Sequence, residues 1–437
     1  MTWVLNIVYM ALLSLLSPVI LWKSLRYGRY RDGWMEKLFG RLPIFGDQQP
    51  VVWFHAVSVG EVLQLQKIVQ SFREDVGDAV QILVTTSTDT GFELANTRFP
   101  GCTVSWFPLD FSWAVTNAVW RVRPQVVVLV ELELWPNFLN ACAKFGAKTA
   151  LINARMSDRS FRGYSRINWL TSRMFARFSI VAAQNSEAAD RLVSLGAARK
   201  ATHVTGSVKF DGVSSDRRNA ATCVLRSLFA ITADDTVLIA GSTQAPEEKM
   251  AVAAWQQLRE VHDNLRLILV PRHRERFDEV ADMVRSHNVP LVRRSQLSGT
   301  DHVNAEAVIL LDTVGELSAC WGLAEIAFVG GSFGSRGGQN MLEPAAYGAA
   351  VLFGPNTWNF KDIVAKLLNA EAAVQLQTQG DFQSTVAALL ADSAERRRLG
   401  QAAQSFVSAQ QGAIARTVAL LTTMMPVDEH QDQRHAA

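Results

Sequence analysis

The sequence predicts an α/β protein with two doubly wound domains facing each other across a cleft, preceded by a hydrophobic anchor helix. Near-continuous apolar segments of strand length alternate with amphipathic helical segments along most of the 437 residues. This alternation is typical of parallel strands that are covered on both faces. It occurs in two series, separated by a polar, turn-rich stretch, so we expect two domains joined by a linker.

The first element is the apolar segment Trp3–Trp22, which as a helix is about long enough to cross the roughly 30 Å hydrocarbon layer of a bilayer. Tryptophan stands at both ends, as interfacial anchors do. No charged side chain precedes the segment, and five basic residues follow it: Lys23, Arg26, Arg29, Arg31 and Lys37. This order is the reverse of a signal peptide. The positive-inside rule therefore predicts a single anchor over residues 1–30, with the body in the cytoplasm; Pro18 leaves a spanning or an in-plane helix open.

The first series predicts a domain over residues 31–205. Its expected strands lie within 51–57, 80–87, 103–110, 124–134, 149–155 and 179–185. A linker is expected over 206–235. The second series predicts a domain over 236–425, with strands within 236–242, 265–271, 307–313, 326–332 and 349–355. The polar residues 426–437 are expected to be disordered.

Composition excludes several classes of function. The formal net charge is +2, which gives no global argument for nucleic-acid binding. The four cysteines are scattered, and the eight histidines form no metal-binding pattern, so we expect no metal site. No Gly-x-Gly-x-x-Gly follows a first strand, which argues against a nicotinamide cofactor. We expect no cofactor at all.

A glycine-rich stretch from Val329 to Gly348 marks the clearest candidate ligand site of the second domain. Glycine lets backbone N–H groups approach a ligand, and a helix N-terminus favours an anion. We expect a helix to begin near Asn340, a good capping residue, with Glu343 on the same helical face. That carboxylate could accept from ribose hydroxyls; the simpler interpretation is a capped loop with an incidental glutamate.

Two further loops follow strands of the second domain. Arg272, in "VPRHRERF", could contact a phosphate or carboxylate, whereas Arg274 and Arg276 fit a solvated helix start. The stretch "DTVGEL" adds a third loop, with a helix expected near Gly315. Three such loops converge on a nucleotide-sized site.

The first domain supplies carboxylates at its strand ends. Glu61 stands where a strand gives way to a helix. An acidic residue is favoured in a first helical turn for structural reasons alone, but the carboxyl end of a parallel strand is also where such sheets bind ligands. Glu131 and Glu133 are two apart and share one side of an extended chain. Arg155 and Lys209 supply basic groups nearby in the expected topology.

These stretches together resemble a known enzyme family. "HAVSVGEV", "ELELWPN", "INARMSDRS", "GSVKFD", "PRHRERF", "DTVGEL" and "GGSFGSRGGQNMLEPAAYG", with the N-terminal anchor, are similar to the 3-deoxy-D-manno-octulosonic acid (Kdo) transferases of lipid A assembly. The resemblance extends from the anchor to about Phe360, with the motifs in the expected order.

The resemblance implies a GT-B glycosyltransferase with two Rossmann-like domains. The enzyme would move Kdo from CMP-Kdo, bound by the C-terminal domain, to a lipid A precursor (lipid IVA) at the cytoplasmic face of the inner membrane. It would invert the anomeric centre without a metal. Glu61 would be the general base, and Glu131 and Lys209 would stabilise the transition state. Donor contacts would come from Pro271, Arg272, Val314, Gly315, Glu316, Asn340, Met341, Leu342 and Glu343. Acceptor or cleft candidates are Ser58, Gly60, Glu133 and Arg155.

Two other functions remain open from the residues. One is another membrane-associated GT-B glycosyltransferase that uses a UDP-sugar, or a nucleotide-sugar epimerase, although an epimerase needs no membrane anchor. The other is a non-catalytic, membrane-tethered nucleotide-binding protein, which would not need Glu61, Glu131 and Glu133 facing the site. The sequence does not reveal the number of Kdo residues added, the acyl specificity or the oligomeric state.

Overall fold

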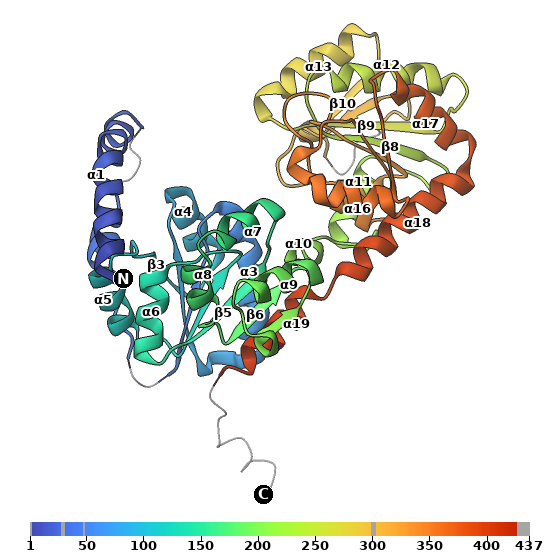
Figure 1. The fold of residues 1–437 in the computed structure, drawn as a ribbon. Coiled ribbons are helices and arrows are strands. Elements are labelled where there is room, and N and C mark those ends of the chain that lie inside the picture. Colours follow the sequence, from blue (N-terminus) through green and yellow to red (C-terminus); the bar gives the residue numbers. More distant parts are fainter. Residues whose placement is uncertain (1, 28–30, 47–48, 299–302, 426–437) are drawn as a thin grey trace, which may run out of the picture. The chain divides into compact units, whose positions relative to one another are not determined.

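The computed structural model describes residues 2–27, 31–46, 49–298 and 303–425. They form two compact units (Figure 1). Unit 1 contains Met1–Gly212 and returns at Gln411–Ala437, and unit 2 is Val213–Gln410. Each unit is built around one parallel sheet of seven strands, so the predicted fold class of two doubly wound α/β domains is confirmed.

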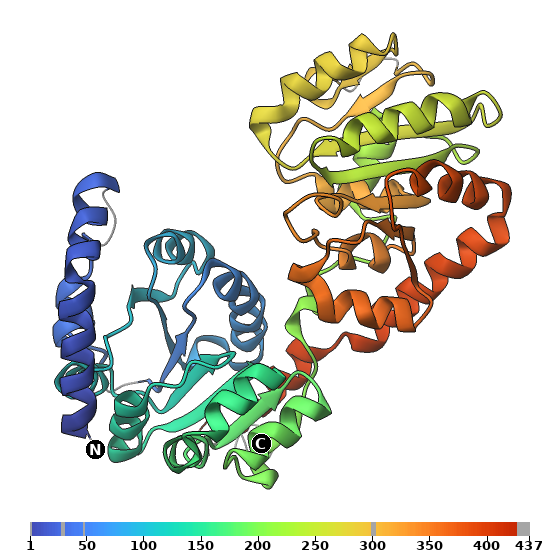
Figure 2. The ribbon, with the colours of Figure 1, turned by 45° about the horizontal axis from the view of Figure 1, so that its top comes forward.

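The sheet of unit 1 has the strand order β3-β2-β1-β4-β5-β6-β7. The strands are β1 (Val51–His55), β2 (Gln81–Thr86), β3 (Thr103–Trp106), β4 (Val126–Val130), β5 (Lys148–Ala154), β6 (Ile180–Ala183) and β7 (Thr202–Val204). Every residue of β1 and β4 is buried. Helices cover both faces of the sheet (Figure 2), which explains why β4 is apolar throughout and β1 is apolar up to its last residue, His55.

Alternate residues of β1 enter different cores of unit 1. Val51 and Trp53 belong to one hydrophobic core, and Val52 and Phe54 to the other. The helices of the unit's globular body are α2 (Trp34–Phe39), α3 (Val59–Val76), α4 (Asp89–Arg98), α5 (Ser112–Val122), α6 (Pro136–Phe145), α7 (Asp158–Ser165), α8 (Asn168–Phe175), α9 (Ser186–Ser194), α10 (Val208–Asp211) and α19 (Ala413–Thr422).

The sheet of unit 2 repeats this arrangement in the order β10-β11-β9-β8-β12-β13-β14. Its strands are β8 (Thr236–Thr243), β9 (Leu265–Pro271), β10 (Leu291–Arg293), β11 (Val308–Leu310), β12 (Ile326–Val329), β13 (Ala350–Phe353) and β14 (Ala373–Gln375). Its helices are α11 (Ala220–Leu228), α12 (Glu247–Arg259), α13 (Phe277–Ser286), α14 (Leu317–Cys320), α15 (Leu342–Ala346), α16 (Lys361–Asn369), α17 (Asp381–Ala391) and α18 (Ser393–Gln410).

The domain boundaries differ from those expected. Residues 411–425 belong to unit 1 rather than to the second domain. Val418 and Leu421 of α19 enter a core of unit 1, and the Asp211 carboxylate accepts from the backbone N–H of Gly412 at 2.7 Å. The expected linker, 206–235, contains α10 and α11, and the two units divide after Gly212. The expected disordered tail, 426–437, lies outside the described residues.

Helix α1 (Thr2–Tyr27) is the one helix in the described parts of the chain that is long and apolar enough to cross a membrane by length and composition. Two polar side chains hold it to unit 1. The Asn6 amide donates to Oγ of Ser112 at 2.8 Å, and the Tyr9 hydroxyl donates to Oδ2 of Asp110 at 3.1 Å. Asn6 is only 5% exposed, although most of the helix is open to solvent.

The basic residues after α1 are not all free. The Lys37 ammonium is buried, lies 3.5 Å from the centre of the Trp106 ring and donates to the carbonyl of Asp32 at 3.0 Å. Burial lowers the pKa of Lys37. Of the five basic residues counted for the orientation of the anchor, Lys37 is therefore not available to a membrane surface. Arg29 lies outside the described residues.

Candidate active site

The topology of each sheet indicates where a ligand binds. In doubly wound sheets the site lies beyond the carboxyl ends of the two central strands at which the strand order reverses. These strands are β1 and β4 in unit 1, and β8 and β12 in unit 2. Glu61 lies in the first turn of the helix after β1, and Glu131 directly follows the last residue of β4. Two predicted carboxylates therefore flank the reversal point of unit 1.

The carboxylate of Glu61 is fixed by the turn that starts α3. Its Oε2 accepts from the backbone N–H of Val57 at 2.9 Å, and its Oε1 accepts from the Ser58 hydroxyl at 2.8 Å. Ser58 is the N-cap of the helix, and its Oγ accepts from the Glu61 backbone N–H. This is a capping box in which the glutamate bonds one residue further out than usual. Gly60, exposed in the same turn, faces open space: an added Cβ would meet only Oγ of Ser58, at 3.9 Å.

Glu131 and Glu133 lie in the turn after β4. Glu131 adopts φ 58°, an uncommon left-handed conformation for a glutamate. Its carboxylate pairs with Arg155 at 3.1 Å. Burial raises the pKa of Glu133 to about 7, with the negative charges of Glu61 and Glu131 adding to the shift. A hydrogen bond from the Trp135 indole at 3.0 Å opposes it. The three carboxylates are therefore electrostatically coupled.

A polar network behind Glu61 was not found from the sequence. The Asn153 amide donates to Gln64 of α3 at 2.7 Å, and its Oδ1 accepts from the backbone N–H of Val208 at 3.3 Å. Gln184 donates to the same Oδ1 at 3.0 Å. Asn153 thus links α3 to the start of α10, which carries the exposed Lys209. Within unit 1, the predicted Lys209 is held on an element tied to the helix of Glu61.

In unit 2, a buried carboxylate shapes the loop after β12. Glu247 is 1% exposed and begins α12, after β8. Its carboxylate accepts from the backbone N–H groups of Gly331 at 2.8 Å, Ser332 at 3.0 Å and Phe333 at 3.1 Å. It also accepts from the N–H of Gln244 at 2.9 Å. Glu247 therefore joins the two strand ends at the reversal point of unit 2, and sequence reasoning missed it because first-turn glutamates are common.

The predicted donor residues near Asn340 are partly reinterpreted by the structure. Helix α15 begins at Leu342, where the Asn340 side chain accepts from the backbone N–H at 3.1 Å. The Asn340 amide donates to Glu343 at 2.9 Å. Burial raises the pKa of Glu343. Met341 and Leu342 are 0% and 2% exposed, so their side chains belong to the core, and a ligand would meet backbone atoms there.

The remaining donor candidates occupy two neighbouring strand ends. Pro271 is the last residue of β9 and is buried, and the exposed Arg272 follows it. Val314 is 71% exposed, and Gly315 has φ 93°. Glu316 pairs with Arg294 at 2.8 Å, so its carboxylate is already partnered. β9 lies next to β8, and β11 lies next to β9, which brings these loops to one edge of the sheet.

Comparison with known proteins shows the family to which this chain belongs. Residues 32–212 match the model of the family described as 3-deoxy-D-manno-octulosonic-acid transferase (kdotransferase). The chain is 32% identical to the 3-deoxy-D-manno-octulosonic acid transferase of Haemophilus influenzae, over 94% of this chain and 97% of the relative. The chain belongs to the Kdo transferase family. It is also 33% identical to the Bordetella pertussis enzyme of that name, over 94% of this chain and 97% of the relative.

As a Kdo transferase family member, the protein is a glycosyltransferase. Its fold is of the GT-B type. The UDP-GlcNAc 2-epimerase of Neisseria meningitidis resembles it in fold, with a TM-score of 0.55 over 85% of this chain and 100% of that one, at 11% identity. At that identity the likeness shows the fold alone. The predicted family and enzyme class are therefore confirmed, whereas the roles of individual residues stay predictions.

Proposed function

We propose that the protein transfers Kdo from CMP-Kdo to a lipid A precursor (lipid IVA) and inverts the anomeric configuration. The observation that carries this proposal is the group of carboxylates at the reversal point of unit 1, where Glu61 is held by Val57 and Ser58. An acceptor hydroxyl is a poor nucleophile until a base takes its proton. The reaction also requires a donor site with a positively charged side chain that can pair with the leaving phosphate.

The chemistry assigned to unit 1 is a single displacement. The acceptor oxygen bonds to the anomeric carbon while the bond from that carbon to the CMP phosphate oxygen breaks. Glu61 takes the hydroxyl proton. Burial, and after it the negative charge of Glu61, raise the pKa of Glu133 to about 7, so this carboxyl group ionises near neutrality.

Glu131 and Lys209 are proposed to stabilise the charges of the transition state. Ser58 and Gly60, in the Glu61 turn, are proposed to border the acceptor together with Arg155.

The donor is proposed to bind at the reversal point of unit 2. Arg272 is exposed and has no carboxylate partner within the described residues, so its guanidinium is free to pair with the single phosphate of CMP. Glu343 and Asn340 are proposed to contact the nucleoside, and Pro271, Val314, Gly315 and Glu316 to line its edge. Met341 and Leu342 would contribute through their backbone.

Attachment to the inner membrane is proposed to occur through α1, with the body on the cytoplasmic side. Exposed apolar side chains occur along the helix, including Trp3 at 79%, Leu15 at 75% and Leu25 at 73%. Trp113 and Trp120 of α5 line one cavity with Trp3. Because Asn6 and Tyr9 bond unit 1 near the start of α1, a spanning helix would draw α5 into the bilayer. We propose that α1 lies in the membrane surface instead.

One incubation tests the reaction. Protein, vesicles with tetraacylated lipid A precursor, and CMP-Kdo are combined, and the lipid is analysed by mass spectrometry. The expected result is a mass increase of one or more Kdo residues, absent with Glu61→Gln. A parallel arm with UDP-sugars tests the alternative donor class. Transfer from a UDP-sugar and not from CMP-Kdo would overturn the proposal.

A further inference from the structure

A hollow of unit 2 lies at the edge of its sheet opposite to the donor loops. It is open to solvent and has a volume of about 540 Å³ between the segment 215–218, the turn at Gly348 and helix α18. Glu325 directly precedes β12, and Gly348 lies two residues before β13. These are the amino ends of the strands, whereas the donor candidates follow the carboxyl ends. A ligand here is therefore distinct from the nucleotide of the donor site.

Close backbone contact between α18 and the Gly348 turn forms this hollow. A Cβ on Gly400 would lie 2.2 Å from the Gly348 carbonyl oxygen, so only glycine allows the helix to approach so closely. Arg396 and Arg397 lie four and three residues before Gly400, on the same face of α18. The approach of the helix therefore carries two guanidinium groups to the rim of the hollow.

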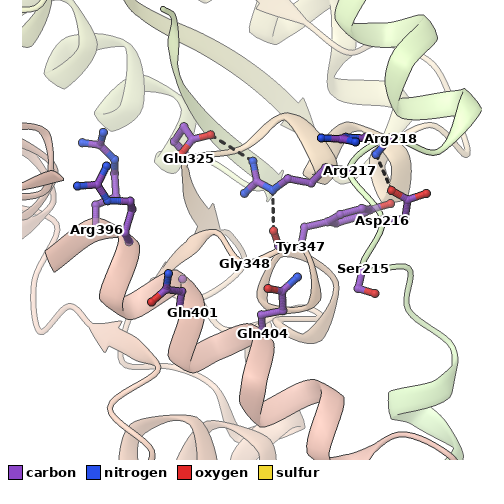
Figure 3. A pocket seen from close by; sticks show the side chains of 12 residues that line it. Ser215, Asp216, Arg217, Arg218, Glu325, Tyr347, Gly348, Arg396, Gln401 and Gln404 are labelled. Atoms are coloured by element: carbon purple, nitrogen blue, oxygen red, sulfur yellow. Dashed lines mark hydrogen bonds and ion pairs between the residues drawn. The ribbon is translucent and has the colours of Figure 1, made fainter. Parts of the chain in front are cut away.

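The charges in the hollow do not cancel. Arg217 is paired with Glu325 at 3.2 Å and also donates to the carbonyl of Tyr347 at 2.7 Å (Figure 3). Arg218, Arg396 and Arg397 have no carboxylate partner within the described residues, and Asp216 is the one further acid that lines the hollow. The Arg396 guanidinium donates to the Leu389 carbonyl at 2.6 Å and that of Arg397 donates to Oγ of Ser393 at 3.4 Å, but neither acceptor carries a charge. Three guanidinium groups without a carboxylate partner, against one carboxylate, leave a net charge of +2 in the hollow.

Two further observations separate this cluster from an ordinary basic surface. Arg398, the next residue along α18, pairs with Glu395 at 2.7 Å and with Glu371 at 3.6 Å, so partners are available on this helix. Nε of Arg396 is a buried donor with no hydrogen-bond partner among the described residues. A buried unpaired donor costs free energy that an acceptor from a ligand would recover.

We propose that this hollow binds an anion with two or more phosphate charges. Guanidinium groups pair with phosphate oxygens in bidentate fashion, and the hollow exceeds the volume of a single phosphate. In Figure 3, Arg218 and Arg396 lie on either side of the Arg217–Glu325 pair, so the ligand meets arginines from two segments. Both segments lead to the places where the chain passes between the units, Gly212–Val213 and Gln410–Gln411. The bound anion therefore ties these two segments together.

Isothermal titration with inorganic pyrophosphate tests the proposal on the full-length protein. Saturating CMP is present throughout to occupy the donor site. Arg218→Gln, and the double variant Arg396→Gln with Arg397→Gln, should each weaken binding, the double variant by at least about tenfold. The matched control removes two charges elsewhere, Arg398→Gln with Arg285→Gln, and should change binding by less than about twofold because these arginines are already paired.

A second arm distinguishes a free phosphate compound from a lipid headgroup. Sedimentation with vesicles that contain phosphatidylglycerol compares the same variants. If Arg218→Gln and the Arg396→Gln, Arg397→Gln double variant lose pyrophosphate binding but still bind vesicles, the ligand is a soluble phosphate compound. If these variants also lose vesicle binding and the control variant does not, the ligand is a lipid headgroup. The proposal is overturned if the variants lose neither pyrophosphate nor vesicle binding, if the control variant loses as much, or if the unaltered protein binds no pyrophosphate in the presence of CMP. Thermal unfolding of each variant confirms that it is folded.

Discussion

Ser58 and Glu61 cap the first turn of α3 together: Oγ of Ser58 donates to Oε1 of Glu61 at 2.8 Å and accepts from its backbone N–H at 3.3 Å. The carboxylate is therefore held in one orientation at the end of β1. A residue placed in this way has a structural role and, by our proposal, a chemical one. Substitutions at the two positions separate these roles.

Replacing Glu61 should abolish most of the turnover without abolishing donor binding. Glu61→Gln keeps the shape of the side chain but removes its capacity to accept a proton, and we expect turnover to fall at least about a hundredfold. Initial rates with saturating substrates and titration with CMP measure the two effects. Ser58→Ala is the control: losing the cap should lower stability by about 1 kcal/mol with a much smaller fall in turnover. Near-normal turnover in folded Glu61→Gln protein would mean that Glu61 acts only as a cap.

Replacing Glu247 should damage the donor site from a distance. Glu247→Ala leaves four backbone N–H groups without their acceptor, so we expect a loss of about 1–3 kcal/mol in unfolding free energy and weaker CMP binding. The matched control is Glu248→Ala, which breaks the 2.5 Å pair with Arg276 but leaves the glycine loop intact. If both variants bind CMP equally well, the loop that Glu247 holds does not form the donor site.

Removing the Arg272 guanidinium should weaken the binding of the donor but not that of the acceptor. Because this group is free to pair with the phosphate, Arg272→Gln should raise the apparent Michaelis constant for CMP-Kdo by about tenfold, the value of one charge-assisted contact. Arg274→Gln, two residues along the same loop, should leave it within about twofold. Kinetics with each substrate varied in turn provide the measurement. A change confined to the acceptor constant would place the donor elsewhere.

Stability should fall as the pH rises from 5 to 8. The pKa of Glu133 rises from 4.5 to about 7 in the fold, and that of Asp110 from 3.8 to about 7, chiefly through burial. The folded protein therefore holds protons that the unfolded chain releases, so the contribution is complete below the unfolded pKa and is lost through about pH 7. Glu133→Gln should reduce the difference in melting temperature between pH 5 and pH 8, leaving the part due to Asp110. An unchanged difference would mean that Glu133 ionises normally.

Removing α1 should separate membrane attachment from catalysis. A protein that begins near Arg31 should stay folded and bind CMP, yet sediment poorly with vesicles and act poorly on embedded acceptor. Detergent-dispersed acceptor should restore part of its activity. Asn6→Leu in the full chain tests the contact with Ser112: it should loosen the helix from unit 1 while keeping its apolarity. Full sedimentation of the truncated form would assign attachment to another surface.

The sequence was informative where the physical signal was long and repeated. Apolar runs identified all the longer strands of both sheets, whereas β7, β10 and β14 have three residues each and lack such a run. Carboxylates after strands pointed to Glu61, Glu131 and Glu133. The roles of Glu247 and Asn153 could not be predicted, because both depend on which loops meet in space. For the same reason the burial of Lys37 and Met341 was missed: local composition does not reveal what a side chain packs against.

The return of α19 to unit 1 has a consequence for how the protein is made. Val418, Leu421 and Met424 fill the same core as Phe54 of β1 and Phe72 of α3, and Lys148 donates to the Met424 carbonyl at 2.8 Å. On the ribosome, all of unit 2 emerges before these residues. The amino-terminal half must therefore wait with part of its core uncovered while the second half folds, and a nascent chain stalled before residue 411 exposes that surface to chaperones and proteases.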